Sequence, residues 1–325
     1  MKRWGVWAAM TAAVLLAMPA MAAMTVKLGV VTKPGSAQNI VAEKFKELVE
    51  ARTAGEVTVK IFHSAALGNE TEILQQIQMG TVEMGVITSG VFDTFDPIVR
   101  VIDYPFLFGD DALADVILDG PLGAEILAGL ETSGFKGLCF SENGFRNLTN
   151  SKRPVKAASD VDGLKIRVMD SAIHNAIWQS MGANPTPMPW PIYTELEQRV
   201  IDGQENPLWV LEVYRFYEIQ KYMTLTRHVY SPHIDVASLT WWNTLKPEMQ
   251  ALLQTAMKDA AVFQRADNRA GDAERLRMLK EKGMQVEENP DISSFRERTD
   301  RLKEMDLYQD PKVKSLLTRM IEATR

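Results

Sequence analysis

The N-terminal third of the chain alternates between the hydrophobic patterns of strands and of helices. Thr25–Val31 is a short apolar run, and an amphipathic pattern with helical spacing follows over Asn39–Arg52. Apolar and polar residues then alternate over Glu56–Phe62, which predicts a second strand. Strands that alternate with helices at this spacing predict an α/β sheet, with loops at the strand ends available for a ligand.

Later segments extend this pattern. Asn69 is a good N-cap for the next helix, and Met84–Ile87 has the composition of a buried strand. Two strand-like runs, Thr224–Tyr230 and His233–Leu239, are separated by Ser231 and Pro232 and are candidates for a crossover between two lobes. From Pro247 to Gly283, apolar residues recur at helical spacing. A helix of that length would extend roughly 50 Å, which is enough to run along both lobes.

Residues 1–22 have the pattern of a secretory signal. Lys2 and Arg3 precede an apolar run that ends at Met18, and small residues near Ala22 supply a cleavage site. The apolar run is shorter than the roughly 20 residues that a membrane span needs. We therefore expect an exported protein whose signal peptide is cleaved near Ala22.

Charge and cysteine content exclude several classes of partner and site. The formal net charge of −6 becomes −8 once Lys2 and Arg3 leave with the signal peptide. Such an acidic chain is a poor match for nucleic acid or for an anionic membrane surface. Cys139 is the only cysteine, so no intramolecular disulfide can form. Its apolar neighbours favour a buried and unreactive thiol.

The sequence contains none of the common catalytic motifs. It has no HExxH, GxSxG or Walker motif, and no GxGxxG follows the first strand. The four histidines have no metal-ligand spacing, which favours structural roles for His63, His174, His228 and His233. We therefore expect no enzymatic activity and no cofactor.

Arg167 is the most informative residue of the central region. It lies between Ile166 and Val168 in a segment that reads as a buried strand. A buried charge is costly unless it meets a counter-charge, and the planar guanidinium suits a carboxylate bidentately. We interpret Arg167 as the group that holds an acidic ligand.

Other residues of the same region are candidates to complete this site. Arg146, Asn206 and Trp190 supply a second guanidinium, an amide and an aromatic ring, and prolines on both sides of Trp190 predict a stiff extended loop. Each has a structural alternative: a surface or hinge salt bridge for Arg146, and core packing for Trp190. Glu70 lies at the start of a predicted helix. It is a candidate hydrogen-bond acceptor for ligand hydroxyls, and its structural alternative is a carboxylate that complements the helix dipole. Two further candidates complete the set, Gln38 and Trp209.

Several ordered motifs resemble those of one known family. They are Leu67-Gly-Asn-Glu70, Tyr104-Pro-Phe-Leu-Phe108, Asn143-Gly-Phe-Arg146, Gly163-Leu-Lys-Ile-Arg167, Gly182-Ala-Asn-Pro-Thr-Pro-Met-Pro-Trp190 and Asp202-Gly-Gln-Glu-Asn206-Pro207. Together they resemble the DctP family, the solute receptors of tripartite ATP-independent periplasmic (TRAP) transporters. The resemblance covers nearly the whole mature chain.

This resemblance implies a fold and roles for individual residues. The implied fold is an α/β periplasmic binding protein of type II-like architecture, with crossover strands and a long helix along both lobes. Residues 23–144 with 232–270 would form lobe I, and residues 145–231 with 271–325 would form lobe II. By the same resemblance, Arg167 pairs with a ligand carboxylate, Arg146 and Asn206 assist, Trp190 lines the cleft and Glu70 reaches the distal end of the ligand.

The expected function is therefore that of a periplasmic receptor. It would bind a small organic acid, with a sugar acid such as a uronate or aldonate favoured, and deliver it to the membrane subunits of a TRAP permease. A C4-dicarboxylate or a 2-oxo or 2-hydroxy acid is the alternative ligand. A secreted enzyme or a sensor module is the alternative of another class. We expect a monomer that does not bind nucleic acid.

Overall fold

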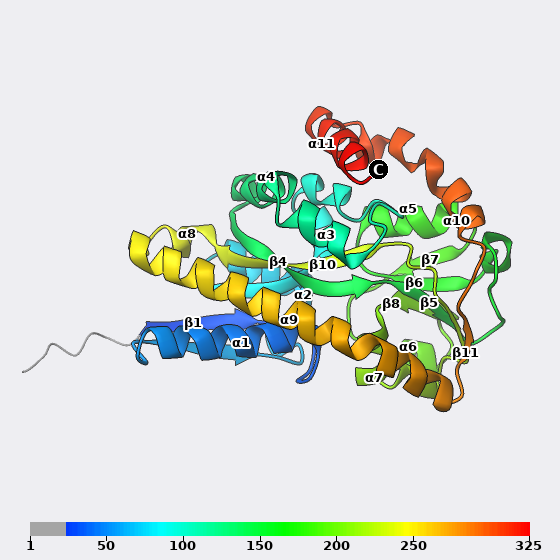
Figure 1. Cartoon of the computed structure of the whole chain (residues 1–325), viewed down its shortest axis with the longest axis horizontal. Helices are drawn as coiled ribbons and strands as arrows, with labels where there is room; N and C mark the ends of the chain where they lie inside the picture. The colour runs from blue at the N-terminus through cyan, green and yellow to red at the C-terminus, as the bar shows by residue number, and fades with distance from the viewer. Residues whose placement is uncertain (1–23) are drawn as a thin grey trace, which may run out of the picture.

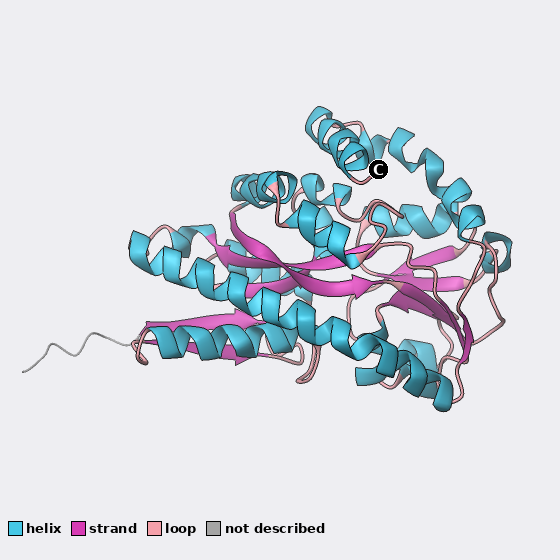
Figure 2. Ribbon diagram, in the orientation of Figure 1, coloured by secondary structure: helices cyan, strands magenta, loops and turns pink. Residues whose placement is uncertain are grey.

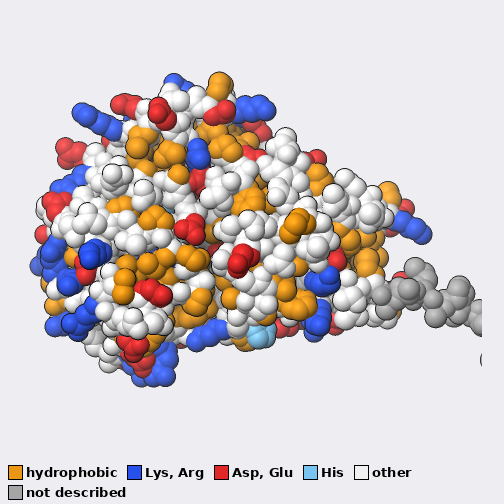
Figure 3. All heavy atoms as spheres, turned by 180° about the vertical axis from the view of Figure 1, so that it is seen from behind, with side chains coloured by type: hydrophobic (Ala, Val, Ile, Leu, Met, Phe, Trp, Pro, Cys, Tyr) orange, Lys and Arg blue, Asp and Glu red, His pale blue; other side chains and the backbone are white. Residues whose placement is uncertain are grey.

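The computed structural model describes residues 24–325 (Figure 1). The predicted signal peptide and its cleavage near Ala22 lie outside these residues. Within them, no helix combines the length and the apolar character needed to cross a membrane. Seen from behind, the surface carries small groups of hydrophobic side chains between charged ones (Figure 3).

Two sheets form the centre of the two lobes (Figure 2). In lobe I the strand order is β2-β1-β3-β10-β4, with β1 Met24–Gly29, β2 Val57–Phe62, β3 Met84–Thr88, β4 Phe135–Phe145 and β10 Tyr230–Ser238. In lobe II the order is β11-β9-β5-β8-β6-β7, with β5 Asn147–Asn150, β6 Lys165–Val168, β7 Asn184–Pro187, β8 Gly203–Asn206, β9 Tyr222–Thr224 and β11 Gln285–Glu287. The expected α/β fold with two sheets is confirmed.

Helices cover these sheets and connect the lobes. Their bounds are α1 Ala37–Arg52, α2 Glu70–Gln78, α3 Asp111–Leu118, α4 Pro121–Gly129, α5 Ala172–Ser180, α6 Tyr193–Glu197, α7 Leu208–Val213, α8 Leu239–Trp242, α9 Pro247–Glu281, α10 Ile292–Thr299 and α11 Pro311–Ala323. The predicted long helix is α9, which packs on α1 and β4 of lobe I and on α7 of lobe II. Figure 1 shows α9, coloured yellow to orange, in front of both sheets.

The packing of α1 follows from its sequence spacing. Ser36 caps the helix by accepting a hydrogen bond from the backbone N–H of Asn39. Val41, Phe45 and Val49 recur every four residues and are fully buried against the first sheet and α9. This packing fixes the position of the first turn of α1, which contains Gln38.

The crossover between the lobes differs from the prediction in two respects. Of the predicted strand Thr224–Tyr230, only Thr224, the last residue of β9, and Tyr230, the first residue of β10, lie in strands. A single strand, β10, passes through Ser231 and Pro232, where the sequence suggested a break between two strands. The register of its pairing with β4 shifts at this point: Ser231 pairs with Gly144 and Pro232 pairs with Glu142, so one residue of β4 is skipped. Proline lacks an N–H for the ladder, and the bulge removes the need for one.

The proline-rich run before Trp190 also forms more regular structure than predicted. Pro185 and Pro187 lie in β7, an edge strand that pairs in parallel with β6. On either side of the prolines, Asn184 donates its backbone N–H to Leu164, the residue before β6, and Met188 donates its own to Val168 at the end of β6. The two prolines occupy the alternate positions, whose nitrogens face away from the ladder, so the strand tolerates them.

The predicted division of the chain between the lobes remains a prediction. The crossover strands β4 and β10 do connect the two sheets at residues close to the predicted boundaries. The C-terminal helix α11 packs against the 3-10 helix Pro97–Val101, and Arg319 on α11 forms an ion pair with Glu125 on α4. The C-terminal segment therefore contacts lobe I elements.

Candidate functional site

A cavity lies between the two lobes, and about 400 Å³ of space in and at its mouth, open solvent included, is not filled by protein atoms. It is lined by residues from lobe I, from lobe II and from the crossover strands. All seven residues of the predicted set line it: Gln38, Glu70, Arg146, Arg167, Trp190, Asn206 and Trp209. The structure brings these residues together, although the part each plays in binding a ligand is still a prediction.

Glu70 forms the lobe I wall of the cavity. Asn69 and Glu72 make the capping box of α2, so Glu70, the first helical residue, is free of that role. Its Oε1 accepts hydrogen bonds from Gln38 Nε2 at 2.7 Å, from the Thr88 backbone N–H at 2.8 Å and from Thr88 Oγ1 at 2.9 Å. Burial raises the pKa of Glu70 despite these bonds. One carboxylate oxygen is thus held, and Oε2 has no hydrogen-bond partner within residues 24–325.

Arg167 lies on the lobe II wall without a carboxylate partner among the described residues. Its Nε and Nη2 both donate to the backbone oxygen of Met188, at 2.9 and 2.6 Å. Its guanidinium carbon lies 5.9 Å from the centre of the Trp190 ring. Burial, and then the nearby Arg146 charge, lower the pKa of Arg167 to about 10. The edge formed by Nη1 and the second Nη2 hydrogen remains free for a bidentate acceptor.

Arg146 is arranged differently, because its charge is already compensated. Its Nε lies 2.5 Å from Glu205 Oε2 and its Nη2 lies 2.9 Å from Glu205 Oε1, and both side chains are buried. The same Nη2 donates to the Glu205 backbone oxygen and to Asn206 Oδ1. The salt bridge that the sequence left open for Arg146 is therefore present. Arg146 and Arg167 both line the cavity, but within residues 24–325 only Arg146 forms an ion pair with a carboxylate.

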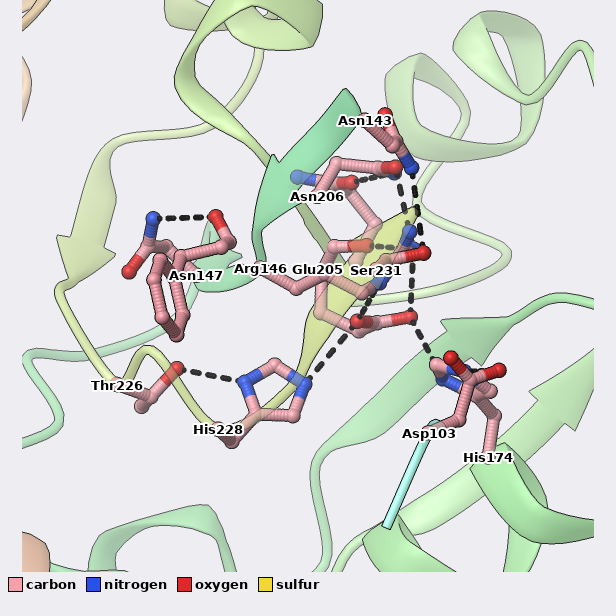
Figure 4. Close-up of polar contacts among 12 residues, drawn as sticks. Asp103, Asn143, Arg146, Asn147, His174, Glu205, Asn206, Thr226, His228 and Ser231 are labelled. Carbon is pink, nitrogen blue, oxygen red and sulfur yellow. Dashed lines mark hydrogen bonds and ion pairs between the residues drawn. The ribbon is translucent and has the colours of Figure 1, made fainter. Parts of the chain in front are cut away.

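A buried network surrounds Glu205 at the junction of the lobes (Figure 4). His228 Nε2 lies 3.1 Å from Glu205 Oε2, and His174 lies between Glu205 Oε1 and Asp103 Oδ2 at 3.6 and 3.3 Å. Burial alone would lower the pKa of His174, but the two carboxylates outweigh it and raise the pKa to about 9. Burial lowers the pKa of His228, which stays neutral. The network therefore contains Arg146 and a protonated His174 against two carboxylates.

This network predicts a pH dependence of stability. The pKa of His174 is about 9 in the folded protein against an ordinary value of 6.5, so folding favours its protonated form. The resulting stabilisation is complete below about pH 6.5 and is lost as the pH rises through 9. We expect the melting temperature to fall between pH 7 and 9, and His174→Asn to flatten that slope. An unchanged slope in calorimetry of the variant would contradict the assignment.

Trp190, Trp209 and Asn206 complete the lobe II wall. The Trp190 ring packs edge-on against Tyr214, with 4.6 Å between ring centres, and Trp209 Nε1 donates to the Asn143 backbone oxygen at 2.8 Å. Asn206 donates to Gln204 as well as accepting from Arg146. Each side chain is held by neighbours, which pre-organises the wall before a ligand arrives.

The two lobes are in contact beside this wall. The Lys33 backbone N–H of lobe I donates to Tyr214 Oη of lobe II at 3.1 Å, and Lys33 Nζ lies 4.8 Å from the centre of the same ring. Tyr214 also packs on Trp190. Lys33 and Tyr214 therefore connect the two lobes directly.

Seven lining residues are not in the predicted set: Val31, Thr32, Thr88, Asn143, Met169, Val210 and His233. Asn143 begins the same motif as Arg146, but an uncharged amide in a strand gives no local sign that it faces a cavity. The sequence predicts a structural role for His233, because a lone histidine in a strand gives no sign of which face it occupies. Within residues 24–325, no group of three or more His, Cys, Asp or Glu side chains is arranged to hold a metal ion.

Sequence comparison places this site in a known family. Residues 28–307 match the model of DctP, described as bacterial extracellular solute-binding protein, family 7. A solute-binding protein of Verminephrobacter eiseniae is 39% identical over 277 residues, which cover 85% of this chain and 83% of that protein. The 2,3-diketo-L-gulonate-binding periplasmic protein YiaO of Escherichia coli is 38% identical over 276 residues, covering 85% and 84%.

Solved structures agree with this result. A TRAP periplasmic solute-binding protein of Polaromonas sp. JS666, bound to D-erythronate, superimposes with a TM-score of 0.88 at 34% identity and covers 92% of this chain and 98% of its own. The sugar acid binding protein DctPAm of Advenella mimigardefordensis, in complex with galactonate, gives 0.87 at 32% identity, with coverage of 92% and 98%. The chain thus belongs to the DctP family of TRAP periplasmic solute-binding proteins, which are receptors and not enzymes.

Proposed function

We propose that this receptor binds a polyhydroxylated monocarboxylic acid, a sugar acid such as an aldonate or uronate, and delivers it to the membrane subunits of a TRAP permease. The observation that carries the proposal is the buried Arg167 guanidinium, which lines the cavity without a carboxylate partner in the described chain. A ligand carboxylate on its free edge would supply the missing counter-charge. Arg146 and Asn206 would flank that carboxylate.

The charges of the cavity favour one carboxylate over two. Arg146 is paired with Glu205, so among the described residues that line the cavity Arg167 is the one cation without an ion pair, and Glu70 places an acceptor on the opposite lobe. A hydroxyl at the distal end of the ligand can donate to Glu70, whereas a second carboxylate there would repel it. This arrangement supports a sugar acid over the C4-dicarboxylate alternative. The erythronate and galactonate bound by the related structures are ligands of the same kind.

A ligand screen tests the proposal. We expect at least one sugar acid of a small panel to raise the melting temperature, because a ligand that binds only the folded state stabilises it. The panel is D-galactonate, D-galacturonate, D-erythronate and 2,3-diketo-L-gulonate. At a ligand concentration of 100 times Kd, the gain is about 2.7 kcal/mol. Succinate and malate should give no comparable shift. Tighter binding of a dicarboxylate than of every sugar acid would overturn the proposal.

The variant Glu70→Gln examines the distal end of the ligand separately. Glutamine keeps the shape and the hydrogen bonds from Gln38 and Thr88 but removes the negative charge. We expect affinity for the best sugar acid to fall about tenfold, because a bond to a charged acceptor becomes a bond to a neutral one. Affinity for succinate should rise by a similar factor. Calorimetric titrations that show both ligands weakened equally would indicate a structural role for Glu70.

A further inference from the structure

Two side chains in the cavity have polar atoms without partners. In the part of the chain that the structure describes, seven buried side-chain nitrogen or oxygen atoms have no hydrogen bond. Only two of them belong to residues that line the cavity between the lobes, Oδ1 of Asn143 and Nδ1 of His233. Buried polar atoms are almost always hydrogen-bonded in folded proteins. Of the seven, these two are the ones whose residues line the cavity, where a ligand could supply the missing partners.

Asn143 lies in a bulge of β4 and lines the cavity. Ser231 of β10 pairs with Gly144 and Pro232 pairs with Glu142, so Asn143 is the extra residue with no partner across the ladder. Gly144 has a φ of +115°, which a residue with a side chain rarely adopts. Bulges of this kind turn a side chain out of the regular alternation of a strand.

Weak contacts hold the Asn143 amide, while its backbone is firmly fixed. Its Nδ2 lies 3.5 Å from Ser231 Oγ, at the limit of a hydrogen bond, and its backbone oxygen accepts from Trp209 Nε1 at 2.8 Å. Figure 4 shows the amide beside Asn206 and close to the Arg146–Glu205 pair. The amide can therefore exchange its long contact for a ligand without disturbing the strand.

His233 lies on the crossover strand between the two walls of the cavity. It pairs in register with Thr88 of β3, and Thr88 Oγ1 donates to Glu70. Burial, together with the Arg146 charge, lowers the pKa of His233 to about 3, so its imidazole is neutral in the periplasmic pH range. A neutral imidazole offers one donor and one acceptor, which is the complement of a hydroxyl group.

We propose that Asn143 and His233 form a hydroxyl-recognition pair. The two side chains would hydrogen-bond to hydroxyl groups in the middle of the ligand, between the carboxylate at Arg167 and the distal end at Glu70. The inference rests on the proposed function and adds the chemistry of the central subsite. Both side chains are uncharged and buried, so they match hydroxyl groups better than a second carboxylate or an unsubstituted methylene chain. The pair thereby contributes to the selection of polyhydroxylated acids.

Titration calorimetry with D-galactonate and its monodeoxy analogues tests this pair. We expect Asn143→Ala and His233→Phe each to lower affinity for D-galactonate by about tenfold or more, the usual effect of leaving a polar group unmatched. At least one deoxy analogue should bind a variant as tightly as it binds the wild-type protein, because the recognised hydroxyl is missing from it. Asn150→Ala is the control, since Asn150 has an unpartnered buried nitrogen but does not line the cavity.

The outcomes separate this inference from the proposed function. If both variants bind D-galactonate and every analogue with wild-type affinity while Arg167→Ala does not bind, the hydroxyl-recognition pair is wrong and the carboxylate site stands. If Arg167→Ala binds normally, the proposed function itself fails. Equal weakening of all analogues would also overturn the pair. Should the variants unfold, the deoxy analogues measured on the wild-type protein decide: an unchanged affinity across the whole series contradicts the inference.

Discussion

Replacing Arg167 with alanine is expected to lower affinity for the best sugar acid about 100-fold or more, without loss of the fold. Removal of one partner from a buried, hydrogen-bonded charge pair costs roughly 2–5 kcal/mol of binding free energy. In this variant the ligand carboxylate would find no guanidinium without an ion pair among the residues that line the cavity, because Arg146 is engaged by Glu205. Calorimetric titration of the two proteins with the same acid measures the effect.

The free protein should tolerate this substitution. Arg167 forms hydrogen bonds only to the Met188 backbone oxygen within residues 24–325, and its burial costs free energy. We therefore expect the melting temperature of unliganded Arg167→Ala to equal or slightly exceed that of the wild type. Arg167→Lys is the matched variant, and it should also bind weakly because an ammonium lacks the planar fork. Wild-type affinity in either variant would exclude Arg167 as the carboxylate-binding group.

Replacing Arg146 with alanine should have the opposite consequence, a large loss of stability in the absence of any ligand. The substitution leaves Glu205 buried with only His174 and His228 as partners, and breaking a buried pair costs about 3–5 kcal/mol. For a chain of this size, the melting temperature should fall by about 10 °C. Differential scanning calorimetry of the unliganded protein gives the measurement.

A double-mutant cycle distinguishes this network from ordinary packing. Arg146→Met combined with Glu205→Gln removes both charges and keeps the approximate volumes, so the pair should destabilise less than the sum of the two single variants. Additive losses would show that Arg146 stabilises the junction by packing alone. The ligand affinity of the double variant, compared with that of the wild type, then measures the direct contribution of Arg146 to ligand binding.

The two arginines show where local sequence stops being informative. Both occur in recognisable motifs, and both are buried. The apolar strand around Arg167 predicts a buried guanidinium, and the structure confirms the strand and the burial. The counter-charge of Arg146 is Glu205, which is 59 residues away and becomes its neighbour only through the pairing of β5 with β8. Nothing in the sequence near Arg146 could reveal that contact.

The prediction of local structure also succeeds where a feature depends on residues close in sequence, and fails where it depends on a distant segment. The cap at Asn69, the helical spacing of α1 and the length of α9 depend on residues that are close in sequence, and the structure confirms them. The continuity of β10 through Pro232 depends on a bulge in the neighbouring β4, and the strand at Pro185 depends on its place at the sheet edge. Propensity cannot predict either, since it treats each segment without its partner.

The sequence by itself determined the α/β class, the family and the seven residues that meet in the cavity, because periodic patterns, caps and ordered motifs are properties of short segments. Only the tertiary structure decided that Arg167 is free while Arg146 is paired, that Glu70 has one engaged oxygen, and that Asn143 and His233 reach the same cavity. Charge compensation and burial depend on distances between residues that are far apart in the chain, and the fold alone sets those distances.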